Sequence, residues 1–417
     1  TVFTGYQKTE DIGYVLAIIK YGQLVKAASK DEIVSLILDK SPFYVECGGQ
    51  ISDQGEIEIK GKTAQILSLK KINNAIAIEV KLPETVAISE SVKQTVNKEF
   101  RTNTMKNHTA THLLQAALVQ VLGKTVKQSG SVVTPDYLRF DFTYHENLTQ
   151  DQITKVEDII NRKITENIQT NITETTYKAA VDKGVIAFFG DKYNPDCVRV
   201  VEVPGFSAEL CGGTHVRATG DIGAFKITEV SALSAGNRRL VAVTGPKAIE
   251  LFQQDFNIVK QLCQDFKIQT EQVLEAVNKQ KDLLKTTQAQ VKQLKKQLLS
   301  KEIPSWLNKL EQISNLNFLF LKLDNYDISE LRDIAQELTS KKPGLYFVVS
   351  AVENKPVVVS SISKDLKNSF NMKNFALWLK EQGINGGGSD VSFQGSASSL
   401  EINLEDKIKK YLQENIK

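Results

Sequence analysis

The feature that most constrains this chain is a pair of short motifs that together hold three of its four histidines. One motif is His-Thr-Ala-Thr-His, and the other, much further along the chain, is Cys-Gly-Gly-Thr-His. Histidines four positions apart project from one face of a helix, and two glycines let a turn fold back between its end residues. The motifs predict a tetrahedral zinc site, because zinc suits mixed nitrogen and sulfur ligands, here His108, His112, Cys211 and His215.

Either motif alone is weak evidence, because the same spacing arises by chance on ordinary helices and turns. The use of three of four histidines in two complementary motifs favours one shared site. The remaining histidine, His145, lies in the polar run Thr-Tyr-His-Glu-Asn and is predicted to be solvated.

Length and composition indicate a protein of several domains. A chain of 417 residues predicts two to four domains, and a net charge of +3 gives no global sign of nucleic-acid binding. No apolar run is long enough to span a membrane, and no signal peptide is recognisable. Four scattered cysteines predict the reducing cytoplasm. Because the chain begins at Thr1, we expect a portion excised from a longer protein.

Hydrophobic patterning predicts a multidomain α+β chain of four parts. Residues 1–93 contain short strand-like segments, which predict a small antiparallel β-barrel. Residues 94–245 combine both patterns in an α+β domain. Residues 246–303 predict a helical hairpin that Pro304 ends, and residues 304–417 predict a separate α/β domain.

The patterns also give bounds for individual elements. The predicted strands are 13–19, 33–38, 55–60, 75–81, 138–142, 317–323, 345–352 and 357–362. The predicted helices are 105–122, 149–167, 328–338, 371–382 and 404–416. Residues 197–243 are β-rich, and the three glycines near residue 387 are predicted to form a loop.

The second helix of the hairpin has an apolar residue every seven positions but a mostly polar companion column. A long two-stranded coiled coil is therefore poorly supported. Its exposed side is rich in lysine, including Lys292 and Lys296. These lysines form either a solubilising face or a contact with RNA phosphates.

Several of these segments resemble the alanyl-tRNA synthetase family. Residues 205–216 and 219–226 are similar to the signature of its editing domain, and residues 108–114 to the helical half of that domain. Residues 43–50 resemble the glycine-rich loop of the preceding barrel, and Gly386, Gly387 and Gly388 lie where the family's C-terminal RNA-binding domain has such a loop. The resemblance covers essentially the whole chain.

The sequence departs from the family in three ways. Cys47 stands where the family has a small residue without a thiol. The loop after residue 385 lacks the arginine that often follows the family's glycines. No segment resembles the core that binds ATP and charges tRNA, so this chain alone should not charge tRNA.

The resemblance implies that the chain hydrolyses tRNA(Ala) mischarged with serine or glycine. A pocket that selects alanine rejects these near-isosteres poorly, so a second site must remove them. The resemblance assigns recognition of the serine hydroxyl to Thr111 and Gln128, and adds Ser131 and Arg139 to the substrate site. An alternative interpretation of Thr111 is that its hydroxyl bonds only to the backbone of its own helix. The alternative for Arg139 is a solvated arginine at the end of a strand.

The zinc ion has two alternative roles in this scheme. It activates a water molecule if one coordination position is open, or it only organises the pocket if Cys211 and three histidines fill its shell. The same resemblance implies that the C-terminal domain binds the outer corner of the tRNA through its glycines. A homodimer through the helical or C-terminal part is a further expectation, with no DNA or membrane partner.

Three alternative functions are compatible with parts of the sequence. A free-standing deacylase of mischarged tRNA would share its chemistry, and a non-catalytic RNA-binding protein would use zinc for structure alone. A zinc peptidase needs a glutamate directly after the first histidine of HxxxH, and this chain has Thr109 there.

Overall fold

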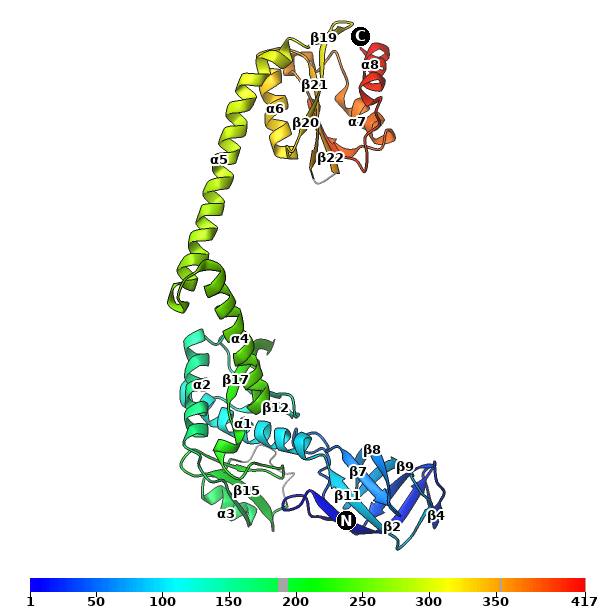
Figure 1. Ribbon diagram of the computed structural model, residues 1–417, viewed down its shortest axis with the longest axis vertical. Helices are drawn as coiled ribbons and strands as arrows, with labels where there is room; N and C mark the ends of the chain where they lie inside the picture. Colours follow the sequence, from blue (N-terminus) through cyan, green and yellow to red (C-terminus); the bar gives the residue numbers. More distant parts are fainter. Residues whose placement is uncertain (187–193, 353–354, 417) are drawn as a thin grey trace. The chain divides into compact units, whose positions relative to one another are not determined.

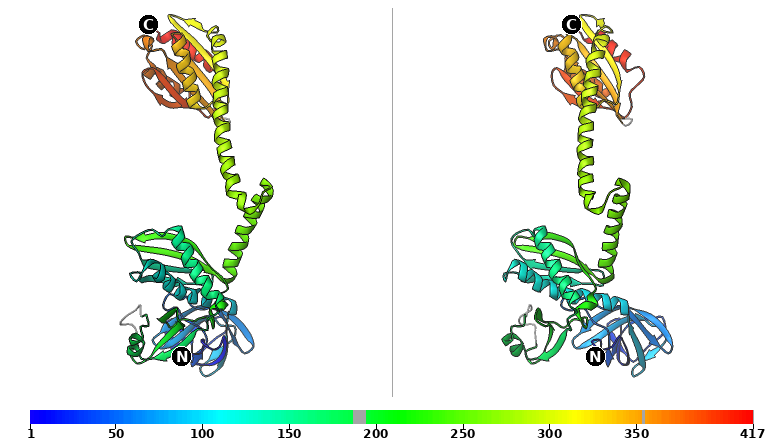
Figure 2. Two further views of the ribbon diagram at one scale, coloured as in Figure 1. Left: turned by 90° about the vertical axis from the view of Figure 1, so that its left-hand side faces the viewer. Right: turned by 60° about the vertical axis from the view of Figure 1, so that its left-hand side comes forward.

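The computed structural model describes residues 1–186, 194–352 and 355–416. The chain divides into two compact units, Thr1–Lys267 and Ile268–Lys417. Each unit combines helices with β-sheets (Figures 1 and 2), which confirms the predicted multidomain α+β class. Among the residues described, every helix is too short or too polar to cross a lipid bilayer. The finer division into four domains stays a prediction.

The first unit begins with a closed barrel of six antiparallel strands. They are β2 (Glu10–Lys20), β5 (Ile33–Leu38), β7 (Gly55–Ile59), β8 (Lys62–Ile72), β9 (Ala75–Lys81) and β11 (Ser91–Val96). Their order is β11-β7-β8-β9-β5-β2, and pairing of β11 with β2 closes the cylinder. Alternate apolar side chains point inward and form one core, so the predicted barrel is confirmed. Shorter strands are β1 (Val2–Phe3), β3 (Gln23–Val25), β4 (Ala27–Ala28), β6 (Lys40–Ser41) and β10 (Val86–Ala87).

Two barrel strands, β8 and β11, were not predicted. Strand β8 has the sequence Lys-Thr-Ala-Gln-Ile-Leu-Ser-Leu-Lys-Lys-Ile, and most of its side chains are exposed or half-buried. Its polar residues hide the alternation that marks a half-buried strand. Strands β5 and β9, whose apolar residues dominate, match their predicted bounds.

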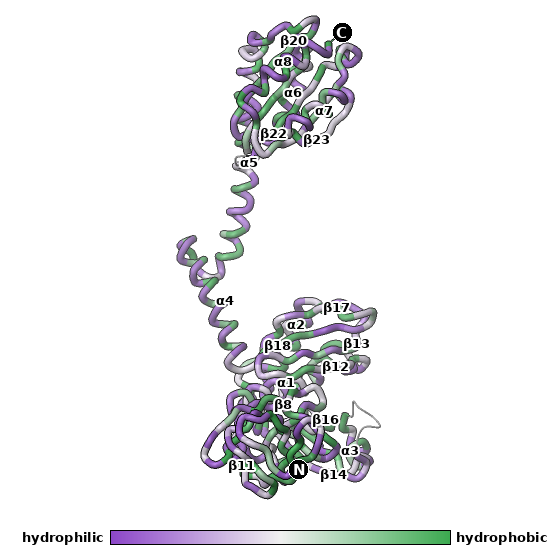
Figure 3. Tube along the Cα trace, turned by 90° about the vertical axis from the view of Figure 1, so that its right-hand side faces the viewer, coloured by the Kyte–Doolittle hydropathy of each residue, from purple (hydrophilic) through white to green (hydrophobic). Residues whose placement is uncertain are grey.

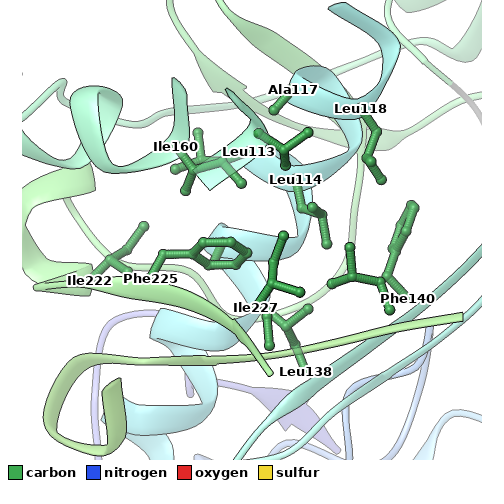
Figure 4. Packing of buried hydrophobic residues seen from close by; sticks show 14 of the residues in the cluster. Leu113, Leu114, Ala117, Leu118, Leu138, Phe140, Ile160, Ile222, Phe225 and Ile227 are labelled. Atoms are coloured by element: carbon green, nitrogen blue, oxygen red, sulfur yellow. The ribbon is translucent and has the colours of Figure 1, made fainter. Parts of the chain in front are cut away.

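The rest of the first unit is built on a four-stranded antiparallel sheet covered by two helices. The sheet runs β12 (Gln128–Val133), β13 (Leu138–Thr143), β18 (Asn237–Thr244) and β17 (Phe225–Ser234). Helices α1 (Lys98–Leu122) and α2 (Gln150–Thr165) pack on one of its faces. Figure 4 shows Leu113, Leu114 and Leu118 of α1 beside Phe140 and Ile227 of the sheet.

Helix α1 begins seven residues before the predicted start at residue 105. The Asn97 side chain caps it by accepting a hydrogen bond from the backbone N–H of Phe100. The added turns are polar, and Arg101 and Thr104 within them are nevertheless buried. Tertiary contacts therefore stabilise a segment that shows no apolar stripe.

A second, three-stranded sheet follows α2. It consists of β14 (Asn171–Thr175), β15 (Val198–Val203) and β16 (Ser207–Leu210), with the short helix α3 (Tyr177–Asp182) beside β15. A 3-10 turn, η2 (Thr219–Ile222), leads to β17, and helix α4 (Gly245–Phe266) follows β18.

A buried ion pair joins the barrel to α1. Arg101 is 2% exposed and donates through Nε to Asp53 Oδ1 at 2.8 Å, while its Nη2 atom contacts Oδ2 of the same carboxylate. The guanidinium also donates to the carbonyls of Gly5 and Pro42 at 2.7 and 2.8 Å. All these partners belong to the barrel or its connections, so one arginine fixes the helix against it.

The second unit contains a six-stranded sheet with helices on both faces (Figure 1). Its order is β19 (Glu311–Ile313), β20 (Leu316–Asp324), β21 (Leu345–Val352), β22 (Lys355–Ile362), β24 (Ser392–Ser396) and β23 (Asn385–Gly388). Phe347 packs with α7 (Met372–Glu381) and α8 (Leu404–Asn415). Its neighbour Tyr346 packs on the opposite face with α6 (Ile328–Lys341) and the end of α5 (Val273–Leu307). The short turns η3 (Thr270–Gln272) and η4 (Lys364–Leu366) complete the unit.

Two sequence predictions in this unit were wrong. Pro304 does not end the helix, because α5 continues to Leu307 with Ile303 and Trp306 buried against the sheet. The three glycines form strand β23 rather than a loop. A Cβ atom on Gly386 would lie 2.0 Å from the carbonyl oxygen of Gln394, so glycine permits this close approach of two strands.

Outside its last turns, α5 exposes most of its side chains. Hydrophilic and hydrophobic residues alternate along it in Figure 3, and Leu284, Val291 and Leu298 are among its exposed apolar residues. A helix of this kind has little tertiary packing of its own.

Removal of Asp53 should destabilise the first unit strongly, because it leaves the Arg101 charge buried without a partner. We expect Asp53→Ala to cost about 3–5 kcal/mol of unfolding free energy, measured by urea denaturation. The double variant Arg101→Met/Asp53→Ala should lose less. As a control, Glu10→Ala removes the exposed partner of Lys98 and should leave the midpoint almost unchanged. Equal midpoints for Asp53→Ala and the control would contradict the structural role of the pair.

Candidate metal centre

Two separate elements of the first unit bring the predicted ligands together. Helix α1 carries His108 and His112 one turn apart, and the segment after β16 carries Cys211 and His215. The four ligand atoms all lie within 4.8 Å of one another. Sγ of Cys211 is 3.3 Å from Nε2 of both His108 and His215. The structure thus places both motifs around one point.

The turn between the ligands depends on a glycine. A Cβ atom on Gly213 would lie 2.0 Å from Cε1 of His108, a distance that no side chain can accept. The backbone N–H of Gly213 also donates to Sγ of Cys211 at 3.4 Å. Glycine here lets the turn press directly against the helix.

A glutamine from the barrel orients His108. Oε1 of Gln50 lies 2.8 Å from Nδ1 of His108 and accepts the backbone N–H of Thr214 at 2.9 Å. Nε2 of Gln50 donates to the Thr214 hydroxyl, also at 2.9 Å, so the orientation of the amide is fixed. Oε1 can only accept, and Nδ1 of His108 must therefore carry its proton. Nε2 is left with a free lone pair that faces Cys211.

A threonine fixes His215 in the same way. The Thr109 hydroxyl donates to the Met105 carbonyl at 3.1 Å and accepts the backbone N–H of Val216 at 3.2 Å. Its remaining lone pair faces Nδ1 of His215 at 3.1 Å. His215 therefore also presents an unprotonated Nε2 to the centre.

His112 is held less tightly. Its Nδ1 lies 3.6 Å from a carboxylate oxygen of Glu209, beyond normal hydrogen-bond length. Glu209 is itself buried and accepts a hydrogen bond from the Ser207 hydroxyl. Burial raises the pKa of this carboxyl to about 8.

The geometry and chemistry of these residues fit zinc. Zinc–sulfur and zinc–nitrogen bonds of about 2.3 and 2.1 Å would separate the two ligand atoms by about 3.6 Å across a tetrahedral angle, close to the 3.3 Å observed. Burial lowers the pKa of His112 to about 3 and holds those of His108 and His215 well below the usual value, so all three imidazoles are neutral. Burial also raises the pKa of the Cys211 thiol to about 12, and a cation would stabilise its thiolate.

Sequence reasoning missed the residues that orient these ligands. Gln50 stands at the end of the glycine-rich segment 43–50, and Thr109 was considered only as the residue that excludes a peptidase. No local pattern marks Glu209 as a neighbour of His112. These contacts join residues 58, 106 and 97 positions apart, and only the folded chain reveals them.

Three of the predicted substrate residues lie on α1 or face it, and the fourth lies on the other face of the sheet. Gln128 and Ser131 lie opposite Phe142 and Phe140 in the β12–β13 ladder and so face α1. Nε2 of Gln128 donates to the Ser131 hydroxyl at 3.1 Å. Thr111 is buried in α1 and donates to the carbonyl of Asn107 at 2.8 Å, which is the helix-internal bond considered as its alternative.

Arg139 is on the other face of the sheet. It alternates with the core residues Leu138 and Phe140 along β13 and pairs with Asp141 at 3.6 Å. Arg239 binds the same carboxylate through two hydrogen bonds of 2.8 and 2.9 Å. The structure does not bring Arg139 to the candidate ligands, and its place in the substrate site stays a prediction.

The predicted RNA-binding residues lie in the second unit. Lys292 and Lys296 are exposed on α5, whereas Lys295 between them pairs with Glu330 at 3.1 Å. Gly387 and Gly388 are exposed on the edge strand β23, and Gly386 is half-buried.

Two stretches of the chain match known families. Residues 198–241, which contain Cys211 and His215, match the threonyl and alanyl tRNA synthetase second additional domain. Residues 1–100 match class II (A) tRNA synthetases.

Similar curated proteins are alanine–tRNA ligases. The enzyme of Fervidobacterium nodosum is 36% identical over 404 residues, which cover 96% of this chain and 46% of the relative. The enzyme of Thermotoga maritima is 38% identical over 393 residues, 93% of this chain and 44% of the relative. The chain thus spans about half the length of the curated relatives it matches.

Among solved structures, the C-Ala domain of Aquifex aeolicus alanyl-tRNA synthetase matches 25% of this chain and 97% of its own, with 20% identity and a TM-score of 0.24. The family matches and the relatives along nearly the whole chain show that this protein belongs to the alanyl-tRNA synthetase family.

Proposed function

We propose that this chain is the editing and tRNA-binding part of an alanyl-tRNA synthetase, which hydrolyses tRNA(Ala) mischarged with serine or glycine. The observation that carries the proposal is the cluster of three buried histidines and one partly buried cysteine. Its Cys-Gly-Gly-Thr-His half lies inside the stretch that matches the second additional domain of these synthetases.

His108, His112, Cys211 and His215 would hold one zinc ion. When bound, zinc supplies Lewis acidity that polarises an ester carbonyl. Of the four ligands, His112 is the least restrained, because its second nitrogen lies 3.6 Å from Glu209. This difference supports a centre in which one ligand is replaceable over one whose shell is permanently closed.

Thr111 and Gln128 would select the serine substrate. The Thr111 hydroxyl already gives its proton to Asn107, so its oxygen is left as an acceptor for the hydroxyl of serine. Gln128 likewise keeps its carbonyl oxygen as an acceptor while its amide donates to Ser131. Alanine offers no donor, and an acceptor left unpaired costs about 1–3 kcal/mol. Selection of serine over alanine follows from that penalty.

The second unit would hold the body of the tRNA. Lys292 and Lys296 present two cations one helical turn apart, and neither pairs with a carboxylate among the residues that the structure describes. Their spacing suits contact with an RNA backbone, and the relatives' role as tRNA ligases supports that partner. A homodimer through the helical or C-terminal part and action in the cytoplasm are parts of the same proposal.

Replacement of the thiol ligand should abolish editing. Changes in the surroundings of a metal cost about 10–100-fold in activity, so Cys211→Ala should reduce hydrolysis of seryl-tRNA(Ala) by at least about 100-fold. The release of serine from radiolabelled seryl-tRNA(Ala) measures this rate. Cys197→Ala, at an exposed cysteine, serves as the control. Turnover by Cys211→Ala at the rate of the control would refute the site.

Loss of Gln128 should relax the choice between substrates. Gln128→Ala should reduce the ratio of kcat/KM for seryl- over alanyl-tRNA(Ala) by about 5- to 150-fold, because one acceptor is removed. Gln120→Ala, at an exposed position on α1, is the matched control. An unaltered serine-to-alanine ratio would remove Gln128 from the recognition site.

The lysines of α5 should contribute to RNA affinity through charge alone. We expect the double variant Lys292→Ala/Lys296→Ala to bind tRNA more weakly and to reduce the salt slope of the binding constant by about one per lysine. Filter binding across a salt series measures the slope. Lys26→Ala/Lys30→Ala alters two exposed barrel lysines with the same spacing. Equal slopes for both double variants would assign the α5 lysines to solubility.

A further inference from the structure

We propose that Arg199 and Tyr6 act together as positioning residues for the metal centre by holding the Cys-Gly-Gly turn from behind. The inference rests on the four-ligand centre of the proposed function and is independent of ester hydrolysis. Neither residue is a ligand, and neither belongs to the sequence motifs that predict the site.

The two side chains together bind three successive carbonyl groups. One terminal nitrogen of Arg199 donates to the carbonyls of Cys211 and Gly213, each at 2.8 Å. The Tyr6 hydroxyl donates to the carbonyl between them, that of Gly212, at 2.6 Å. The backbone of Arg199 adds a fourth contact, because its carbonyl accepts the N–H of Cys211 at 3.0 Å. Each carbonyl of the Cys-Gly-Gly turn is therefore held by a side-chain donor.

The two side chains, together called the clamp, also stack on each other. The guanidinium carbon of Arg199 lies 4.1 Å from the centre of the Tyr6 ring, which also packs edge-on against Phe3 at 4.8 Å. A planar cation over an aromatic face is favourable and restricts both groups to one orientation. Both residues also line a cleft of 860 Å³ that borders His215.

The turn needs such support because two of its residues are glycines. Glycine loses more backbone freedom on ordering than any other residue, so an unsupported Cys-Gly-Gly turn would hold Sγ poorly. With the three carbonyls drawn to the clamp, the N–H of Gly213 points to Sγ of Cys211. Sγ of Cys211 is thereby held where Nε2 of His108 and Nε2 of His215 could bind the same metal ion.

Tyr6 belongs to the barrel end of the chain, and so does Gln50, which orients His108. One barrel residue thus acts on the cysteine side of the centre and another on the histidine side. The predicted consequence is that a change in the barrel alone weakens metal binding.

The test measures metal affinity in the full chain. Tyr6→Phe removes one oxygen from a side chain that is 46% exposed, so folding is not at risk. Arg199→Lys keeps the charge but loses the planar group that both stacks and bridges two carbonyls. Zinc affinity is obtained by chelator competition, and the Co²⁺-substituted protein reports thiolate coordination by its charge-transfer absorption. Controls are Tyr21→Phe, at a tyrosine 92% exposed, and Arg217→Lys, at an exposed arginine.

We expect zinc affinity to fall about tenfold in Tyr6→Phe and about 10–100-fold in Arg199→Lys, as for other residues that orient metal ligands. The double variant should lose less than the product of the two effects, because the side chains act as a unit. Melting of the metal-free proteins should match that of the controls. An affinity of Tyr6→Phe within twofold of Tyr21→Phe overturns the inference. A fall in affinity without any hydrolysis by the parent protein would leave the inference standing and refute only the proposed function.

Discussion

The structure depends on the meeting of three buried imidazoles and one partly buried thiol. Burial keeps the histidines neutral and disfavours the thiolate form of Cys211. A bound cation would supply the positive charge that stabilises this thiolate. Because two of the imidazoles carry their proton on Nδ1, the free lone pairs converge on one point. Helix α1 and the Cys-Gly-Gly turn hold the side chains in the positions that this convergence requires.

The barrel is part of this arrangement as well as its neighbour in sequence. Arg101 secures α1 to the barrel through a buried ion pair, and Gln50 then reaches His108 on the same helix. A shift of the barrel by the length of one hydrogen bond would therefore disturb the tautomer of His108, a candidate metal ligand. The stretch that matches class II synthetases and the helix that carries two of the candidate ligands therefore contact each other directly within the first unit.

The sequence predicted the four ligands because their spacing is local, four residues apart on a helix and four across a turn. It predicted strands such as β5 and β9 because their apolar residues dominate, and it missed β8 because polar residues cover that strand. Gln50, Thr109 and Glu209 were not predictable as supports, since each acts across a distance in sequence that only packing closes. Pro304 misled in the same way, because burial of Trp306 outweighs the lost hydrogen bond of a proline within a helix.

Strand β23 has a consequence for how the second unit meets its surroundings. It lies at the edge of the sheet and consists of an asparagine and three glycines, so it offers peptide groups with almost no side chain over them. An edge strand usually risks pairing with other chains, but pairing here would bury little apolar area and gain little free energy. The β23 edge can therefore attract only partners that form hydrogen bonds with its backbone. Such bonds do not distinguish one side chain or base from another.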